Sequence, residues 1–134
     1  LDRGPELSRP ARVLAVWMVL RSVGRTALAA QIETDLALAQ LAAELIAEDD
    51  RFEIVDEPQL SIVAFRHRAR DGESEKDRSR RDADLMEATL ADGTSMLSTT
   101  VLDGRNTLRL VVMNHRTAED DVCLTVRKLR ELAS

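Results

Sequence analysis

The alternation of apolar and polar residues is clearest in residues 95–116, where it predicts two strands joined by a tight turn. Asp103-Gly104 predicts a type I′ turn, because that turn requires a positive φ at both central residues. If Leu102 and Arg105 flank the turn, one face of the hairpin is largely apolar and the other polar. A slip of one residue would exchange these faces, so the pattern itself favours this register. The expected cross-strand neighbours are Thr99 with Leu108 and Leu97 with Leu110, beside Val112, on the apolar face, and Ser98 with Arg109 and Thr100 with Thr107 on the polar face.

The rest of the chain predicts four helices and a second pair of strands, with the order α-α-β-β-α-β-β-α. This order predicts an α+β fold: a small antiparallel or mixed sheet with helices packed on one face. The first expected helix covers Arg12–Val23 and is ended by Gly24, and the second runs from a cap at Thr26 to Ala47. The third runs from a cap at Ser79 or Asp82 to Ala91 and is ended by Gly93, and the fourth begins at a cap at Thr117. The expected strands are Phe52–Val55 and Leu60–Arg66, followed by a charged surface loop over Arg68–Arg81.

The first predicted helix, Arg12–Val23, has no polar face between Arg12 and Arg21. A helix that is apolar all round is usually buried all round. Either it is a central core helix of this domain, or part of its cover comes from a missing domain or a second subunit. The strand Leu60–Arg66 is also apolar on both faces, which predicts a central strand covered on both sides.

Composition narrows the classes of function. The net charge of −5 and the presence of only three aromatic residues argue against a nucleic-acid-binding protein. One cysteine, Cys123, and two histidines, His67 and His115, predict no disulfide and no metal site. The longest apolar run, Val13–Leu20, is shorter than the roughly 20 residues that span a bilayer, and there is no signal-peptide pattern, so we expect a cytoplasmic protein without a membrane partner.

Few residues suggest chemistry. There is no glycine-rich phosphate loop and no nucleophile with a base beside it, so we assign no catalytic residue. Arg109 lies on the polar face of a predicted strand, where a guanidinium can bind a carboxylate through two hydrogen bonds. Alternatively, it is a surface arginine that pairs across the strand or with a nearby acid. His115 can be a ligand or base, or can make a structural hydrogen bond. Cys123 is expected to be a small buried hydrophobe.

Several segments in the same order resemble one family, the group II amino-acid decarboxylases that depend on pyridoxal phosphate, of the aromatic-L-amino-acid and tyrosine decarboxylase type. The resemblance covers essentially the whole chain and is weakest at Arg68–Arg81. The matching segments are Ser8–Trp17, Phe52-Glu53, Leu60–Arg66, Leu97–Arg105, Leu108–Leu110 and Asn114–Thr117.

The resemblance implies a type-I aminotransferase-like fold and a homodimer. In the family, a large domain holds pyridoxal 5′-phosphate on a lysine, and the cofactor acts as an electron sink while the substrate loses CO2. The lysines of this chain, Lys76 and Lys128, lie in no such context. We therefore expect a C-terminal portion of such an enzyme, inactive and without cofactor on its own: residues 1–24 as an N-terminal segment with the helix at the domain junction, and residues 25–134 as the small domain.

The resemblance also implies site residues. Leu7, Ser8 and Arg9 correspond to a segment that reaches the neighbouring subunit's substrate pocket, and Ser8 to a position that influences substrate choice. Arg109 matches an arginine that lies near the substrate carboxylate in glutamate-specific relatives.

Two departures concern the junction helix, since Pro10 replaces an arginine and Ala15 a lysine of many members. The alternative is a free-standing interaction or regulatory domain, derived from the family, that binds a partner through its apolar helix.

Overall fold

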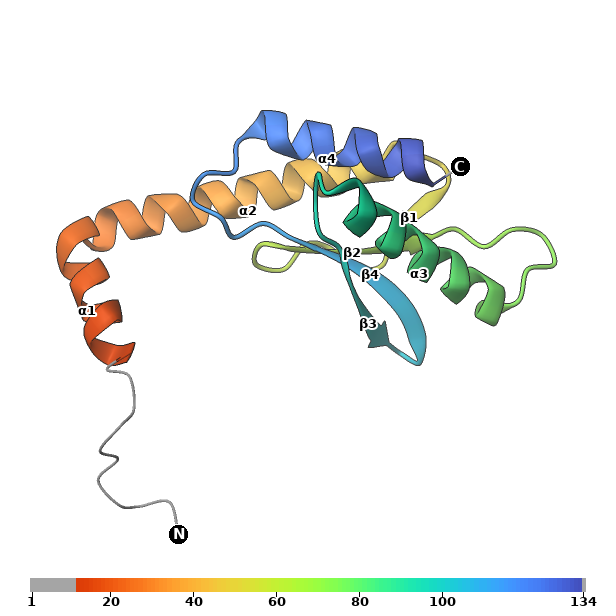
Figure 1. Ribbon diagram of the computed structural model, residues 1–134, viewed down its shortest axis with the longest axis horizontal. Helices are drawn as coiled ribbons and strands as arrows, with labels where there is room; N and C mark the ends of the chain where they lie inside the picture. Colours follow the sequence, from red (N-terminus) through yellow and green to blue (C-terminus); the bar gives the residue numbers. More distant parts are fainter. Residues whose placement is uncertain (1–11, 134) are drawn as a thin grey trace, which may run out of the picture. The chain divides into compact units, whose positions relative to one another are not determined.

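The computed structural model describes residues 12–133, and the helices and strands follow the predicted order (Figure 1). The chain divides into two compact units between Glu33 and Thr34. The first holds α1 and the start of α2, and the second holds the rest of α2 and all later elements. The elements are α1 (Arg12–Val23), α2 (Arg25–Ala47), β1 (Phe52–Ile54), β2 (Ile62–His67), α3 (Glu75–Asp92), β3 (Ser98–Leu102), β4 (Arg105–Val111) and α4 (Glu119–Leu132).

The sheet is antiparallel throughout, with the strand order β1-β2-β4-β3. The register predicted for the β3–β4 hairpin is confirmed, because Ser98 lies opposite Arg109 and Leu102 opposite Arg105. Asp103 and Gly104 have φ values of 50° and 74°, as a type I′ turn requires. The turn therefore fixes which side chains of β4 face the helices.

One face of the sheet carries the hydrophobic core, as predicted. Figure 1 shows α3 and α4 on the same side of the sheet, and the second half of α2 packs into the same core. Phe52 and Phe65 meet edge to face with their ring centroids 5.6 Å apart. The largest fully buried apolar side chains that join sheet and helices are Ile46, Phe52, Val63, Phe65, Leu108 and Leu129.

The prediction that β2 is a central strand is confirmed, because it lies between β1 and β4. The described residues cover its second face only in part, so the predicted full cover on both sides is not found among them. Ile62 and Ala64 point to that face and are only half-buried. The strand also begins later than predicted. Leu60 is exposed and has a φ of 56°, a left-handed conformation that interrupts an extended strand.

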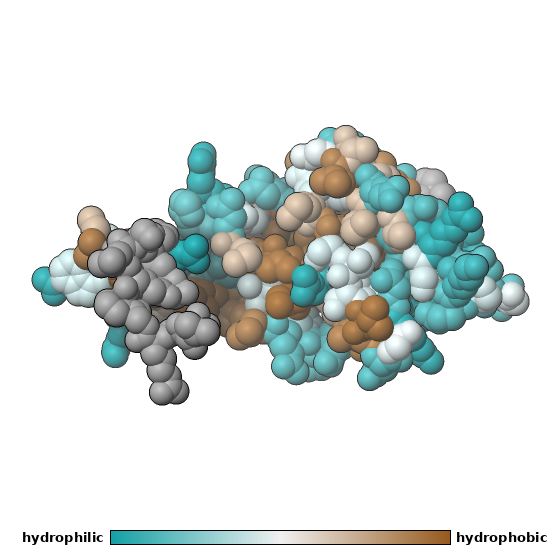
Figure 2. Space-filling view, turned by 60° about the horizontal axis from the view of Figure 1, so that its bottom comes forward, coloured by the Kyte–Doolittle hydropathy of each residue, from teal (hydrophilic) through white to brown (hydrophobic). Residues whose placement is uncertain are grey.

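The predicted bounds of α1 are confirmed, and Gly24, at φ 82°, follows its last residue. None of its residues is buried, and the exposed fraction of its large apolar side chains runs from 44% at Leu20 to 83% at Val13. The hydrophobic core of the described residues consists of side chains from Leu38 onward and includes none from α1. Figure 2 shows apolar residues, in brown, reaching the surface in several groups among hydrophilic ones.

The prediction that Arg68–Arg81 forms a loop is confirmed only as far as Ser74, because α3 begins at Glu75. Ser74 is its N-cap, and the Ser74 Oγ accepts a hydrogen bond from the Asp77 backbone N at 3.2 Å. The interleaved acids and bases of this stretch hid a helix whose buried face is partly charged. That face consists of Arg78, Asp82, Leu85 and Thr89, spaced as successive helical turns require.

Two other helix starts differ from the prediction. Thr26 lies inside α2, which begins one residue earlier, at Arg25. The N-cap of α4 is Ala118 rather than Thr117, and its backbone N donates to the Asp121 Oδ2 at 2.9 Å.

Among the described helices no single one is long and apolar enough to cross a membrane. Helices α1 and α2 reach the required length and hydropathy only when they are taken together across the bend between them.

Candidate functional site

Arg109 lies on the sheet face that the helices leave open. Its Nε and Nη2 atoms both donate to the Ser98 Oγ, each at 3.2 Å. The two residues are cross-strand neighbours, so the hairpin register brings them together. No acid pairs with Arg109 among residues 12–133, so within that range only the cross-strand half of the structural alternative, pairing with Ser98, is confirmed. A half-buried guanidinium without a counter-ion is suited to binding an anion.

A groove of about 590 Å³ runs past Arg109 along the end of the β3–β4 hairpin and the start of α4. Its apolar wall includes Met96, Val111 and Met113, all exposed. Its charged residues are Arg109, Arg116 and Asp121, and the Asp121 carboxylate already accepts the hydrogen bond that caps α4. The groove therefore combines an available cation with apolar surface.

The other residues predicted from the sequence do not join this groove. Leu7, Ser8 and Arg9 lie outside the described residues. His115 is exposed, and its side chain makes no hydrogen bond or ion pair within the described part of the chain. Cys123 is exposed on α4, so the prediction that it is a buried hydrophobe is wrong. It follows Val122 on the helix, and it is Val122, Val126 and Leu129 that turn toward the core.

A buried pair that sequence reasoning missed joins β2 to α3. The His67 Nδ1 and Asp82 Oδ1 atoms are 2.8 Å apart, and the same oxygen accepts from the His67 backbone N at 3.0 Å. His67 is 3% exposed and Asp82 is 0% exposed. No motif pointed to them, because the two residues lie 15 positions apart in different elements and meet only through the tertiary fold.

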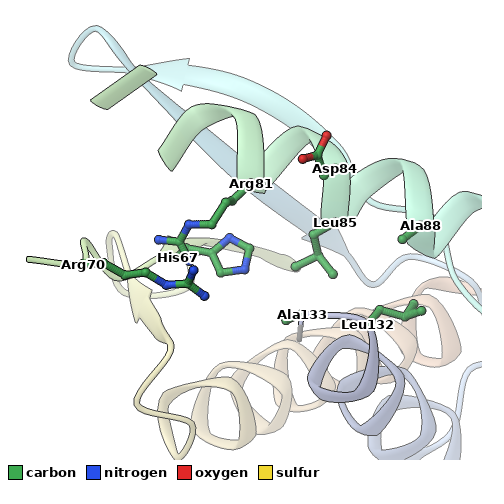
Figure 3. A pocket seen from close by; sticks show the side chains of 8 residues that line it. All are labelled: His67, Arg70, Arg81, Asp84, Leu85, Ala88, Leu132 and Ala133. Atoms are coloured by element: carbon green, nitrogen blue, oxygen red, sulfur yellow. The ribbon is translucent and has the colours of Figure 1, made fainter. Parts of the chain in front are cut away.

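The ring of His67 also lines a small cavity of about 270 Å³ (Figure 3). Figure 3 shows the imidazole beside Arg81 and Leu85, with Arg70 nearby and Leu132 and Ala133 across the space. The Arg81 Nε and Nη2 atoms donate to the two oxygens of Glu73, each at 2.7 Å. These bonds lower the pKa of Glu73 to about 2 and leave the Arg81 charge neutralised.

A second ion cluster, close to this pair, has a structural role. The Glu53 Oε1 accepts from the Arg66 Nε and the Arg78 Nη2, both at 2.6 Å. Burial raises the pKa of Glu53, but the hydrogen bonds from both arginines outweigh it, so the pKa lies below its usual value. Arg78 also donates to the carbonyl oxygen of His67. The cluster fastens α3 to β1 and β2, and its charges are used within the chain.

Comparison with known proteins points to one family. The family described as Pyridoxal-dependent decarboxylase conserved domain matches residues 4–68 of this chain. Tryptophan decarboxylase 1 of Oryza sativa subsp. japonica is 36% identical over 109 residues, which is 79% of this chain and 21% of that protein. Aromatic-L-amino-acid decarboxylase of Bacillus atrophaeus is 30% identical over 130 residues, which is 97% of this chain and 27% of that protein. The chain thus spans about a quarter of the length of these curated relatives.

Solved structures agree with the sequence matches. The crystal structure of Oryza sativa TDC with PLP and tryptamine superimposes with a TM-score of 0.85 at 30% identity, covering 96% of this chain and 28% of that one. The structure of Rhodiola rosea 4-hydroxyphenylacetaldehyde synthase gives a TM-score of 0.81 at 30% identity, covering 96% and 27%. Both matches extend over nearly the whole of this chain and about a quarter of the matched chain.

The described residues do not themselves fit a pyridoxal phosphate site. Such a site needs a lysine amine that forms a Schiff base. Lys76 is exposed on α3, within the charged N-terminal half of that helix. The Lys128 Nζ lies 2.9 Å from Glu131 and 3.8 Å from Asp92, and the hydrogen bond to Glu131 raises the lysine pKa. A raised pKa keeps the amine protonated, which is the wrong form for a nucleophile.

Proposed function

We propose that this chain, which belongs to the pyridoxal-phosphate-dependent amino-acid decarboxylases, corresponds to the C-terminal region of such a carboxy-lyase and serves as its small domain. The observation that carries the proposal is the match of its fold, over 96% of its length, to a structure that holds PLP and tryptamine. In this role the chain contributes packing and part of the rim of an active site, while a large domain supplies the cofactor lysine.

Within this proposal, residues 1–24 form the segment and helix at the domain junction and residues 25–134 form the small domain. The exposure of α1 supports this division. Val16, Trp17 and Met18 are all more than half exposed, and full burial of one large apolar side chain contributes roughly 1.5–3 kcal/mol. A large domain, a second subunit of a homodimer, or both would cover this helix.

We also propose that Arg109 belongs to the substrate-pocket rim, together with Leu7, Ser8 and Arg9. Arg109 supports this role because its guanidinium has no acidic partner among the described residues and faces a groove with apolar walls. The proposed substrate is an amino acid whose carboxylate is held before it leaves as CO2. A cytoplasmic location is part of the same proposal.

The test begins with the coding DNA upstream of Leu1. We expect an open reading frame that encodes a large domain with a cofactor lysine, and the purified product, supplied with pyridoxal phosphate, should release CO2 from aromatic amino acids. An unrelated sequence upstream, together with a stable complex between this chain and a different protein, would instead favour the free-standing interaction domain.

A variant pair tests the role of α1 in that product. Trp17→Asp places a charge on α1, and Leu90→Asp places the same charge on α3 at a side chain that is similarly exposed, 61% against 56%. We expect Trp17→Asp to reduce CO2 release and dimer formation, and Leu90→Asp to leave both unchanged. If the two variants showed equal CO2 release and equal dimer formation, the proposal that α1 is covered by another domain or subunit would be contradicted.

A further inference from the structure

The contact between Ser98 and Arg109 has a geometry that goes beyond simple pairing. Two N–H groups of the guanidinium, on Nε and on Nη2, converge on one hydroxyl oxygen. From this we infer that Ser98 is a positioning residue, which fixes Arg109 so that its Nη1–Nη2 edge binds the carboxylate of a ligand with an apolar body. The inference rests on the proposed function and adds Ser98, which neither the sequence nor the comparisons assign.

The unused edge of Arg109 carries the argument. A guanidinium has five N–H donors in a rigid plane, and the hydrogen bonds to Ser98 occupy two of them. One donor on Nη2 and two on Nη1 remain, and Nη1 has no partner among the described residues. Nη1 is accessible to solvent, whereas the buried polar atoms without a partner in the described part of the chain belong to Asp82, Ser95 and Arg130. The Nη1–Nη2 edge offers two parallel donors at the spacing of a carboxylate.

The backbone explains why a serine can hold the arginine in this way. Ser98 and Arg109 lie directly opposite each other on β3 and β4, and the turn at Asp103-Gly104 fixes that register. The short side chain of Ser98 thereby holds the long, flexible side chain of Arg109 at its guanidinium group. This tether reduces the number of rotamers that Arg109 must give up when a ligand binds, which is the usual benefit of preorganisation.

The groove indicates the class of ligand. Met96 and Met113 are about three quarters exposed, and with Val111 they form an apolar wall of the groove that also contains Arg109. A volume of about 590 Å³ is within the range of small-molecule sites. The acid of the groove, Asp121, accepts the hydrogen bond that caps α4 and forms no ion pair with Arg109 in the described part of the chain. A carboxylate joined to an apolar group satisfies both parts of this surface.

The experiment is an NMR titration of the 134-residue chain with indole-3-propionate, and with indole-3-propionamide as the uncharged probe. We expect the carboxylate to shift the Arg109 Nε–H and the Ser98 amide resonances, and the amide probe to shift neither. Ser98→Thr keeps the hydroxyl and Ser98→Val has the same shape without it, so both suit a strand. Ser98→Val should weaken carboxylate binding about tenfold, whereas Ser98→Thr should bind like the wild type.

Two controls separate the possible failures. Thr100→Val removes a hydroxyl from the same face of β3, opposite Thr107 instead of Arg109, and should not change binding. Arg109→Gln should abolish it. If Ser98→Val binds as tightly as Ser98→Thr while Arg109→Gln does not bind, the positioning role is overturned and the carboxylate role of Arg109 stands. If the carboxylate shifts no resonance of the groove, both roles are overturned, and CO2 release by the longer gene product still tests the proposed function.

Discussion

The buried contact between Asp82 and His67 predicts a large effect of a small substitution. In Asp82→Ala, the His67 backbone N–H and the ring Nδ1 both lose the oxygen that they share at 3.0 and 2.8 Å. A buried group left without its hydrogen bond costs about 1–3 kcal/mol, so the two orphaned groups together cost about 2–6 kcal/mol. The Asp82 Oδ2 is itself buried without a partner, and its removal offsets part of that cost. We therefore expect the free energy of unfolding to fall by about 2–4 kcal/mol.

The assay is urea unfolding of the chain followed by far-UV circular dichroism, which yields the free energy of unfolding from the midpoint and slope. Asp84→Ala is the matched control, because Asp84 lies on the same helix and is exposed. Its effect should remain within about 0.5 kcal/mol. If Asp82→Ala and Asp84→Ala unfolded at the same urea concentration, the reasoning that this contact fastens α3 to β2 would be refuted.

Three more substitutions test other parts of the fold. Gly104→Val forces a β-branched residue into φ 74° and should destabilise the chain by about 1–2 kcal/mol in urea unfolding, with Thr99→Val as a control on β3 outside the turn. Leu108→Ala, at a fully buried site, should cost about 2–5 kcal/mol by the same measurement, and a loss below 1 kcal/mol would contradict its central place in the core. The pKa of Glu73 is lowered from 4.5 to about 2, so its pairing with Arg81 stabilises the fold above pH 4.5 and this contribution is lost as the pH falls toward 2. Glu73→Gln should therefore be less stable than the wild type at pH 7 and equal to it near pH 2, and a constant difference over that range would exclude this explanation.

The sequence predicted the elements whose signals are local. The Asp103-Gly104 turn sets the β3–β4 register through backbone conformation alone, and Gly24 and Gly93 end α1 and α3 in the left-handed region. The order of elements and the helices on one face of the sheet follow from such signals. The resemblance to the decarboxylases was also confirmed by the comparisons.

What the sequence did not predict depends on tertiary contacts. The first turns of α3 were missed because Arg78 and Asp82, which are polar, occupy positions of its buried face. Their burial makes sense only beside Glu53 and His67, which belong to other elements. The same holds for the candidate site: the sequence could suggest a role for a strand arginine and its neighbour Ser98, but their two hydrogen bonds and the groove beside them required the structure.

The strand order has a consequence for how the chain folds. β1 with β2 and β3 with β4 are local hairpins, a kind of unit that forms in about 1–10 μs, whereas β2 joins β4 only after the chain between them, including α3, has closed into a loop. The last helix, α4, then supplies Val122, Val126 and Leu129 to the core. On the ribosome the domain can therefore complete its core only when synthesis reaches Leu132, and release of a chain stopped before Glu119 should yield an aggregation-prone intermediate with its sheet uncovered.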